Sequence, residues 1–381
     1  MNRRRFLQRA GATGAAALLA GCQAQQTTET PADTDTEAPT DTDTETTRGT
    51  ATRTPEPGTL VVATYDSFID APSSSPGAWI KERFEAETGA TLVWKTPPNE
   101  VNYFIERANA GVDTEADVYV GLDTGTLIRV DNKLKSGRLF DEAGDLEGRS
   151  AVKDGLAFDP KGRAVPYDTG YISLVWNATM GGGDFVAPET FDGLLDPEFE
   201  DDLLAQNPST SETGRAFLLH TIKAKGEDGY LDYWSRLKDN GVRVLGKWDD
   251  AYNAYTGGEA PMVVSYSTDQ VYAHRYGNDL AKHQIRFLND QGYANPEGMA
   301  RFANTDQPEL ARTFMEFLLR PEVQGEIAVR NVQFPATTDA SLPESYAEYA
   351  KEPPEPVTFT YDELKGTVSD WIEQWQREFA G

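Results

Sequence analysis

Residues 59–65, Thr-Leu-Val-Val-Ala-Thr-Tyr, begin the part of the chain that decides the fold class. This largely apolar run is typical of a buried parallel strand. A helical pattern follows at residues 77–87, with Trp79, Ile80 and Phe84 on one face. The alternation continues with a strand, a helix and another strand, at residues 91–95, 99–108 and 116–123. Such an alternation predicts a parallel sheet with helices on both faces.

The side chains at the ends of these strands are the first candidates for a binding site. Ligands of open α/β sheets bind beyond the carboxyl ends of the strands. The residues found there are Tyr65, Asp66, Asn99 and Asp123. We therefore expect these four residues to contribute to a ligand site.

A long strand at residues 164–176 leads into a second alternating block. The middle of this strand, Asp168-Thr169-Gly170, is polar and favours a hinge over a buried core strand. A further strand is predicted at residues 262–266, and further helices at residues 216–223, 229–237, 307–320 and 361–379. Residues 58–381 exceed the roughly 250–300 residues at which single cores stop growing, so we expect two lobes.

The first 57 residues differ in composition from the rest, and no fold is expected there. Arg3-Arg4-Arg5 before Phe6-Leu7 resembles a twin-arginine export signal, so residues 1–21 are predicted to be a signal peptide. Residues 19–22, Leu-Ala-Gly-Cys, match a lipobox. We therefore expect a lipidated Cys22 that anchors the protein outside the cell membrane. Residues 22–57, rich in Thr, Asp and Pro, are predicted to form a disordered tether.

The chain is strongly acidic, with 35 Lys and Arg against 62 Asp and Glu and a formal net charge of −27. This balance argues against a nucleic-acid partner, because phosphate binding needs Lys and Arg. A salt-adapted, halophilic surface explains most of the charge, since uniform acid keeps a protein hydrated. A cationic ligand would explain particular acids in a cleft. The net charge alone therefore does not identify the ligand.

Sequence motifs of catalysis and of metal or nucleotide binding are missing. The single cysteine permits no intrachain disulfide, and His220, His274 and His283 have no close metal-ligand spacing. The sequence has no GxxxxGK[ST] phosphate loop and no GxSxG elbow. We therefore expect no catalytic residue, no metal site and no cofactor.

Short segments spread over residues 58–381 carry a resemblance to a known family. They are residues 64–68 (TYDSF), 116–118 (ADV), 121–123 (GLD), 165–168 (VPYD), 170–171, 207–208, 210–211, 248, 251–252, 264–268 (VSYST), 272, 307–311 (QPELA), 334–335 (FP), 371–373 and 375. In this order and spacing, the chain resembles the periplasmic thiamine-binding proteins, which are solute receptors of ABC importers.

The resemblance implies an α/β, two-lobed periplasmic-binding-protein fold of type II. In that fold, mixed sheets are flanked by helices and the ligand lies in the cleft between the lobes. It implies a first lobe of residues 58–168 plus 285–335 and a second lobe of residues 169–284 plus 336–381. The implied partners are thiamine or a related small cation, a membrane permease with its ATPase, and the membrane that holds the lipid anchor. We expect a monomer.

Thiamine carries a permanently cationic thiazolium, which aromatic faces and carboxylates hold. Aromatic candidates near strand ends or in loops are Tyr65, Tyr167, Trp248, Tyr266 and Tyr272. By resemblance, Trp248 matches the ring-stacking tryptophan of the family, residues 266–268 its ligand-contacting strand end, and Ser211 a contact to the hydroxyl or phosphate end. The complete predicted ligand site is Tyr65, Asp66, Asn99, Asp123, Asp168, Ser211, Trp248, Tyr266, Ser267, Thr268, Asp269 and Tyr272.

The chain departs from the family pattern at several positions. Asn99-Glu100 replaces an acid–glycine pair, Ser209 replaces a basic residue, and Val332 replaces a late tryptophan. With Glu212 directly after Ser211, the phosphate end of the pocket is expected to lack positive charge. We therefore expect unphosphorylated thiamine to bind at least as tightly as its phosphates.

Two other solutes and one other function class stay open. A polyamine needs several acids in the cleft, and these are present in the sequence. Ferric receptors of this fold typically show adjacent tyrosines, whereas Ser267 follows Tyr266. A cell-surface enzyme is the least favoured alternative because the catalytic motifs are missing.

Overall fold

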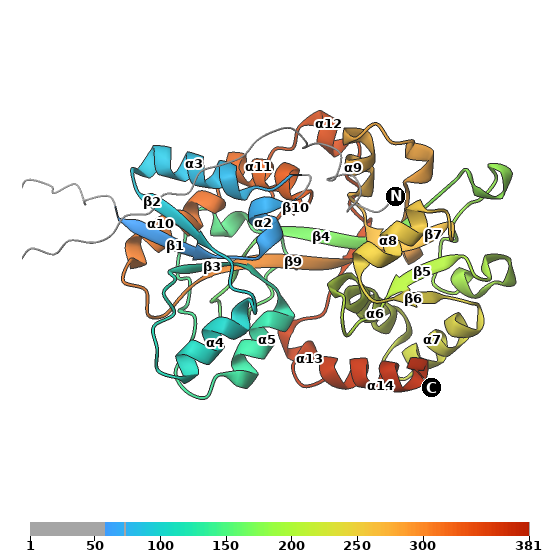
Figure 1. Cartoon of the computed structure of the whole chain (residues 1–381), viewed down its shortest axis with the longest axis horizontal. Helices are drawn as coiled ribbons and strands as arrows, with labels where there is room; N and C mark the ends of the chain where they lie inside the picture. Colours follow the sequence, from blue (N-terminus) through green and yellow to red (C-terminus); the bar gives the residue numbers. More distant parts are fainter. Residues whose placement is uncertain (1–57, 72–73, 381) are drawn as a thin grey trace, which may run out of the picture. The chain divides into compact units, whose positions relative to one another are not determined.

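A computed structural model describes residues 58–71 and 74–380. The predicted signal peptide, Cys22 and the tether lie outside the described residues. The described strands form one eleven-stranded sheet whose main path runs β2-β1-β3-β9-β4-β7-β5-β6 (Figure 1). β10 and β8 pair with β4, and β11 pairs with β9. The strands are β1 Thr59–Ala63, β2 Thr91–Lys95, β3 Val118–Leu122, β4 Val165–Trp176, β5 Leu203–Gln206, β6 Arg243–Leu245, β7 Met262–Tyr266, β8 Gln284–Arg286, β9 Gln291–Arg301, β10 Phe334–Pro335 and β11 Glu355–Val357.

The α-helices of the described residues follow the numbering of Figure 1. They are α2 Asp66–Asp70, α3 Gly77–Thr88, α4 Val101–Asn109, α5 Thr124–Lys133, α6 Glu212–Lys225, α7 Tyr230–Asp239, α8 Trp248–Thr256, α9 Asp269–Arg275, α10 Pro308–Leu318, α11 Pro321–Asn331, α12 Glu344–Ala347, α13 Tyr361–Leu364 and α14 Val368–Ala380.

The first half of the sheet confirms the predicted alternation. β1 pairs in parallel with β2 and with β3. One face packs against α3, α10 and α11, in a cluster that contains Phe84 and Phe314. The other face packs against α4 and α5 through Phe104 and Leu127. Helices therefore cover both faces, as the sequence predicts.

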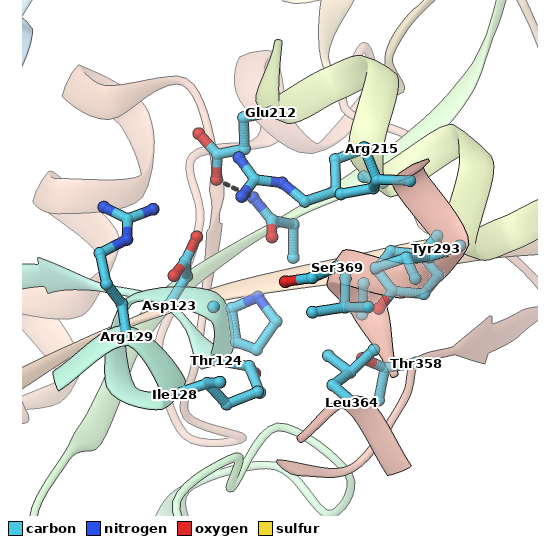
Figure 2. Close-up of a pocket in the computed structure, with 18 of the residues that line it drawn as sticks. Asp123, Thr124, Ile128, Arg129, Glu212, Arg215, Tyr293, Thr358, Leu364 and Ser369 are labelled. Atoms are coloured by element: carbon cyan, nitrogen blue, oxygen red, sulfur yellow. Dashed lines mark hydrogen bonds between the residues drawn. The ribbon is translucent and has the colours of Figure 1, made fainter. Parts of the chain in front are cut away.

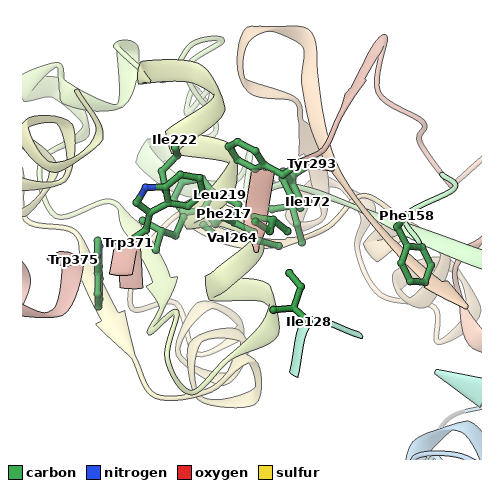
Figure 3. Close-up of a cluster of buried hydrophobic side chains, with 14 of the residues drawn as sticks. Ile128, Phe158, Ile172, Phe217, Leu219, Ile222, Val264, Tyr293, Trp371 and Trp375 are labelled. Carbon is green, nitrogen blue, oxygen red and sulfur yellow. The ribbon is translucent and has the colours of Figure 1, made fainter. Parts of the chain in front are cut away.

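The second half of the sheet is built in the same way. β5 pairs in parallel with β6 and with β7. Helices α6, α7 and α14 pack on one face in a large cluster that includes Phe217, Ile222 and Trp371 (Figure 3). Helix α8 covers the other face through Ala251 and Ala254. This half was only partly predicted, because β5, β6 and α8 are short.

Two long antiparallel strands, β4 and β9, connect the halves. β4 pairs with β9 over residues 165–172 and with β7 over residues 172–176. All twelve residues of β4 are buried, and Asp168 and Thr169 are 0% exposed. Residues 168–170 were predicted to form a polar hinge and not a buried strand. This prediction is wrong, because these residues belong to a buried strand with β9 on one edge and β10 on the other. The sheet is therefore mixed, with parallel pairs within each half and antiparallel pairs along β4 and β9, as expected.

The strand β9 was not predicted, and its proline explains why. Pro296 has no N–H to donate, so a proline normally argues against a central strand. On the edge away from β4, β9 pairs with β11 only as far as Tyr293, and its pairing with β3 begins at Gly298. Pro296 therefore lies in a gap where β9 needs no donor on that edge.

The C-terminal helix is shorter than the expected helix at residues 361–379. Gly366 has φ +90°, a backbone conformation that favours glycine, and it separates α13 from α14.

The predicted lobe boundaries stay a prediction. They fall inside β4, inside β8 and directly after β10.

Candidate functional site

A cavity of about 940 Å³ lies where elements of the two halves of the sheet face each other. Its walls come from the loop after β1, the starts of α4, α5, α6 and α8, and from α9, β9 and the end of α11. Three tyrosines contribute to it, namely Tyr65, Tyr119 and Tyr272. The carboxyl ends of β1 and β3 open into it, as expected for an α/β sheet.

The cavity is lined by more acids than bases. Among the described residues, its carboxylates are Asp66, Glu100, Asp123, Glu212, Asp249 and Glu297. Its cations are Arg129, Arg215 and Lys247. None of these three cations forms an ion pair or a side-chain hydrogen bond with another residue that the structure describes. The cavity therefore offers both a negative surface and free positive groups.

Tyr65 is the predicted residue with the clearest polar role in the cavity. Its hydroxyl donates to Glu297 Oε2 at 2.8 Å and accepts from Asn331 Nδ2 at 3.3 Å. Burial, followed by the nearby charges of Glu297 and Asp168, raises the pKa of Tyr65 well above its usual value. Tyr65 therefore stays a neutral donor and orients the carboxylate of Glu297.

A β-bulge brings two residues of β4 against one residue of β9. Pro166 pairs with Gly298 and Asp168 pairs with Glu297, so Tyr167 is the extra residue. The Tyr167 hydroxyl donates to Glu297 Oε2 at 2.5 Å. Asp168 lies opposite the same glutamate. The bulge thus brings Tyr167 and Asp168 together with Glu297, which lines the cavity.

Asp168 is buried behind this floor and does not line the cavity itself. Its Oδ2 accepts from Asn331 Nδ2 at 2.7 Å, and its Oδ1 has no hydrogen-bond partner among the described residues. Burial, reinforced by the charge of Glu297, raises the pKa of Asp168 well above its usual value, although the Asn331 hydrogen bond opposes this. Direct contact with a ligand therefore requires a rearrangement at Asp168.

Two predicted residues cap helices. Asp123 precedes α5 and accepts from the backbone N–H of Thr126 at 2.5 Å. Ser211 precedes α6 and accepts from the backbone N–H of Gly214 at 3.3 Å. Asp123 also lines the cavity, whereas Ser211 is buried and does not. The next residue, Glu212, lines the cavity in its place.

The predicted aromatic residues of the second half lie in or beside helices. Trp248 is the first residue of α8, not a loop residue, and its neighbours Lys247 and Asp249 line the cavity. Tyr272 lies in α9 and lines the cavity. Tyr266 ends β7 and packs over Gly170, whose missing Cβ would lie 3.0 Å from its ring.

Residues 267–269 lie behind the cavity surface. Ser267, Thr268 and Asp269 are all buried. Asp269 accepts from Tyr252 at 2.5 Å and contacts His283 Nδ1 at 2.7 Å. These partners make Asp269 part of a buried polar network, so its proposed ligand contact has no support from this geometry.

At the start of α4, the cavity is lined by Glu100 and not by the predicted Asn99, which is exposed. Glu100 has φ +47°, a strained conformation for a residue with a side chain. This turn replaces the acid–glycine pair expected by resemblance. It directs a carboxylate toward the site from the neighbouring position.

A smaller cavity of about 290 Å³ adjoins the first and shares Asp123, Arg129, Glu212 and Arg215 with it. Figure 2 shows Glu212 and Arg129 in the upper part of this pocket and Ile128 and Leu364 in the lower part. Glu212 Oε1 accepts from Asn295 Nδ2 at 2.6 Å. Burial in the cleft and the charge of Asp123 raise the pKa of Glu212.

Comparison with known proteins agrees with this geometry. Residues 113–354 match the family model of the bacterial extracellular solute-binding proteins. The chain belongs to this family. A thiamine-binding periplasmic protein of Escherichia coli is 30% identical over 318 residues, which cover 84% of this chain and 92% of the relative. The predicted resemblance is thereby confirmed.

Solved structures agree with the fold of this solute-binding protein. A periplasmic thiamin binding protein matches with a TM-score of 0.68 and 27% identity, covering 84% of this chain and 96% of the other. A ferric binding protein from Campylobacter jejuni matches with a TM-score of 0.66, and at 16% identity over 84% of this chain and 99% of the other it supports the fold alone. These relatives are binding proteins and not enzymes, in line with the sequence.

Several cavity residues of the solute-binding protein were missed in the sequence. Glu297 lies on the unpredicted strand β9, so no local pattern placed it at the site. Arg129 lies on α5, which was also not predicted, although the cap at Asp123 and the apolar Leu127, Ile128 and Val130 are a helix signal. Asn331 reaches the site only because α11 ends beside Tyr65.

No group of His, Cys, Asp and Glu that could hold a metal ion was found among the residues described by the structure. Within that same part of the chain, no helix is both long and apolar enough to cross a bilayer.

Proposed function

We propose that this solute-binding protein captures thiamine, or a thiamine phosphate, in the 940 Å³ cavity and delivers it to the permease of an ABC importer. The observation that supports this most is the combination of acids with tyrosines on the cavity walls. Relatives named as thiamine-binding proteins also match over 84% of this chain.

The walls suit a flat cation. A cation over an aromatic face gains about 0.5–2 kcal/mol, depending on how far it is desolvated. Tyr65, Tyr119 and Tyr272 line the cavity, and Trp248 begins the helix beside two lining residues. We propose that Trp248 stacks on the ligand and that Glu297 and Asp123 face its positive ring. We propose that the other residues of the predicted site either contact the ligand or hold the cavity walls in position.

The charge distribution changes the expectation for the phosphate end. The sequence suggested a lack of cations near Ser211, but Arg129, Arg215 and Lys247 line the same cavity. Cations of this kind are what a phosphate needs. We therefore retain both thiamine and its phosphates as proposed ligands, instead of thiamine alone.

Delivery requires a ligand-dependent change of shape and a location at the membrane. We propose that the two predicted lobes close over the ligand about β4 and β9 and present the closed surface to the permease and its ATPase. We also propose that the protein is a monomer, exported and tethered through lipidated Cys22. Solution scattering measures the radius of gyration of the protein with and without saturating ligand. A smaller radius with ligand would support closure, and an unchanged radius would contradict it.

Calorimetry tests the proposed function. Thiamine, thiamine monophosphate, thiamine diphosphate, spermidine and ferric citrate are titrated separately into the protein at one salt concentration. We expect saturable binding of at least one thiamine form, and much weaker binding of spermidine and ferric citrate. A polyamine is the second candidate because six carboxylates line the cavity. Tight binding of spermidine without binding of any thiamine form would favour that candidate and contradict ours.

A further inference from the structure

Asp168, which is buried behind the cavity floor, and Glu297, which lines the cavity, lie directly opposite each other in neighbouring strands. Side chains in such positions are about 4.5–5.5 Å apart at Cβ. Asp168 is 0% exposed and its Oδ1 has no partner among the described residues. Its other oxygen bonds to Asn331, which also bonds to Tyr65, so the carboxylate faces the cluster around Glu297.

No cation compensates this pair. Neither Asp168 nor Glu297 forms an ion pair with a described Lys, Arg or His. Two carboxylates that share one site cannot both ionise readily, so the pair tends to hold one proton. Burial and then the charge of Glu297 raise the pKa of Asp168 well above its usual value. Burial and then the charge of Glu212 raise the pKa of Glu297 to about 7, although hydrogen bonds from Tyr167 and Tyr65 lower it.

The groups that face the pair come from five elements. β4 contributes Tyr167 beside Asp168, the loop before α2 contributes Tyr65, and α11 contributes Asn331. The charges of Glu212 on α6 and of Asp123, which caps α5, add repulsion. Within the same cavity, Arg215 on α6, Arg129 on α5 and Lys247 before α8 carry positive charge, but none is bonded to the pair.

We propose that Glu297 is the carboxylate that receives the positive ring of the ligand, and that the Asp168–Glu297 pair releases one proton when the ligand binds. This inference rests on the proposed function, because it requires a cationic ligand. In the empty protein the proton screens the repulsion between the two acids. When the cationic ligand binds, its positive charge offsets this repulsion instead. The ionised form of Glu297 is then favoured, and its proton is released to solvent.

Proton release makes binding depend on pH in a defined direction. At about pH 6 Glu297 is mostly protonated in the empty protein, and binding should release close to one proton from it. At about pH 8 Glu297 has already ionised in the empty protein, so the release from it should approach zero. The dissociation constant should therefore fall as pH rises, by up to about tenfold per pH unit on the acid side.

Calorimetry with thiamine in two buffers of different ionisation heat measures the number of protons released. We expect the value near one at about pH 6 and near zero at about pH 8. Thiamine binding with the same heat in both buffers at about pH 6 would overturn this inference and leave the proposed function intact. The absence of binding by thiamine, its monophosphate and its diphosphate at both pH values would overturn both.

Variants separate the pair from the general charge of the cleft. Glu297→Gln should abolish the proton release, flatten the pH dependence and weaken binding at about pH 8 by at least tenfold. Asp249→Asn removes a carboxylate from the same cavity wall and should keep the proton release, whatever its effect on affinity. Proton release that persists in Glu297→Gln would overturn the inference. So would its loss in Asp249→Asn.

Discussion

The indole of Trp248 stacks on the ring of Tyr252, with ring centroids 4.7 Å apart and planes inclined by 20°. The indole Nε1 also donates to Ser265 Oγ at 3.0 Å. The Tyr252 hydroxyl in turn donates to buried Asp269. Trp248 is therefore oriented from one side by the protein before any ligand arrives, which lowers the entropy cost of using it as a binding anchor.

Trp248→Ala should weaken thiamine binding by at least about 1–3 kcal/mol, as expected for the loss of an aromatic anchor. It should also lower the melting temperature modestly, because the stack on Tyr252 and the bond to Ser265 are lost. Calorimetry and thermal unfolding measure the two effects. Trp248→Phe keeps a ring at the site and should recover part of the affinity. A large loss of stability with unchanged affinity would show that Trp248 only packs.

Gly170→Ala should disturb the cavity wall behind the ligand. A Cβ on Gly170 would lie 2.6 Å from Gln333 Oε1 and 3.0 Å from the Tyr266 ring, so both side chains must move. We expect a loss of about 1–3 kcal/mol in the free energy of unfolding and weaker thiamine binding. Gly246→Ala is the control, because its nearest neighbour is at 3.5 Å. Equal effects of both substitutions would contradict this account.

Arg163→Met should be among the most destabilising substitutions of a charged residue. Arg163 is nearly buried and bonds to Asp131 at 2.7 Å and to Asp159 at 3.0 Å. Its removal takes the buried cation away from both carboxylates, at a cost of about 3–5 kcal/mol in urea unfolding. Lys161→Met removes an exposed cation at 2.9 Å from the same Asp131 and should cost at most about 1 kcal/mol. The prediction fails if the two variants are equally stable.

The same cluster gives a prediction for acid unfolding. Burial disfavours the charged form of Asp131, but the hydrogen bonds from Arg163 and Tyr361 outweigh it and lower the pKa to about 2. A lowered pKa stabilises the folded state above the unfolded value of about 4 and loses that effect as pH falls toward 2. The stability difference between wild type and Arg163→Met should therefore shrink in this range.

Glu297 should have the opposite effect on the pH dependence of stability. Its pKa is raised from 4.5 to about 7 in the folded protein, so the folded state holds its proton more tightly than the unfolded state. The contribution of Glu297 to the free energy of unfolding is therefore fully present below about pH 4.5. It is lost as pH rises through 7, by about 3 kcal/mol at most. Glu297→Gln should be less sensitive to pH in this window and more stable than wild type at about pH 8. Parallel stability curves for the two proteins would contradict the raised pKa.

Cys22→Ser should release the exported protein from the membrane fraction, because the proposed lipid attachment requires the cysteine thiol. Ser67→Ala, in the folded part of the chain, is a matched control that leaves this thiol in place. Fractionation of cells that express each variant measures the effect. Cys22→Ser protein that stays in the membrane fraction would contradict the anchor.

The sequence by itself determined the strands and helices whose patterns are local. β2 and β7 begin and end where predicted, and β1 begins there, because buried strands are continuous apolar runs set by neighbouring residues. The family resemblance also came from short local segments, and it carried the overall fold. Four of the twelve predicted ligand residues, Tyr65, Asp66, Asp123 and Tyr272, line the cavity.

Only the tertiary structure decided which charged groups meet at the site. Asp168 and Glu297 are 129 positions apart and become neighbours through an antiparallel pairing and a bulge that no local period encodes. Arg129 and Arg215 reach one cavity from different helices. Asp269 is buried and is bonded to Tyr252 and His283, which are distant from it in the sequence. Hydrophobic periodicity reports which face of an element is buried, but the electrostatics of a cleft depend on distances between elements, which exist only once the chain has folded.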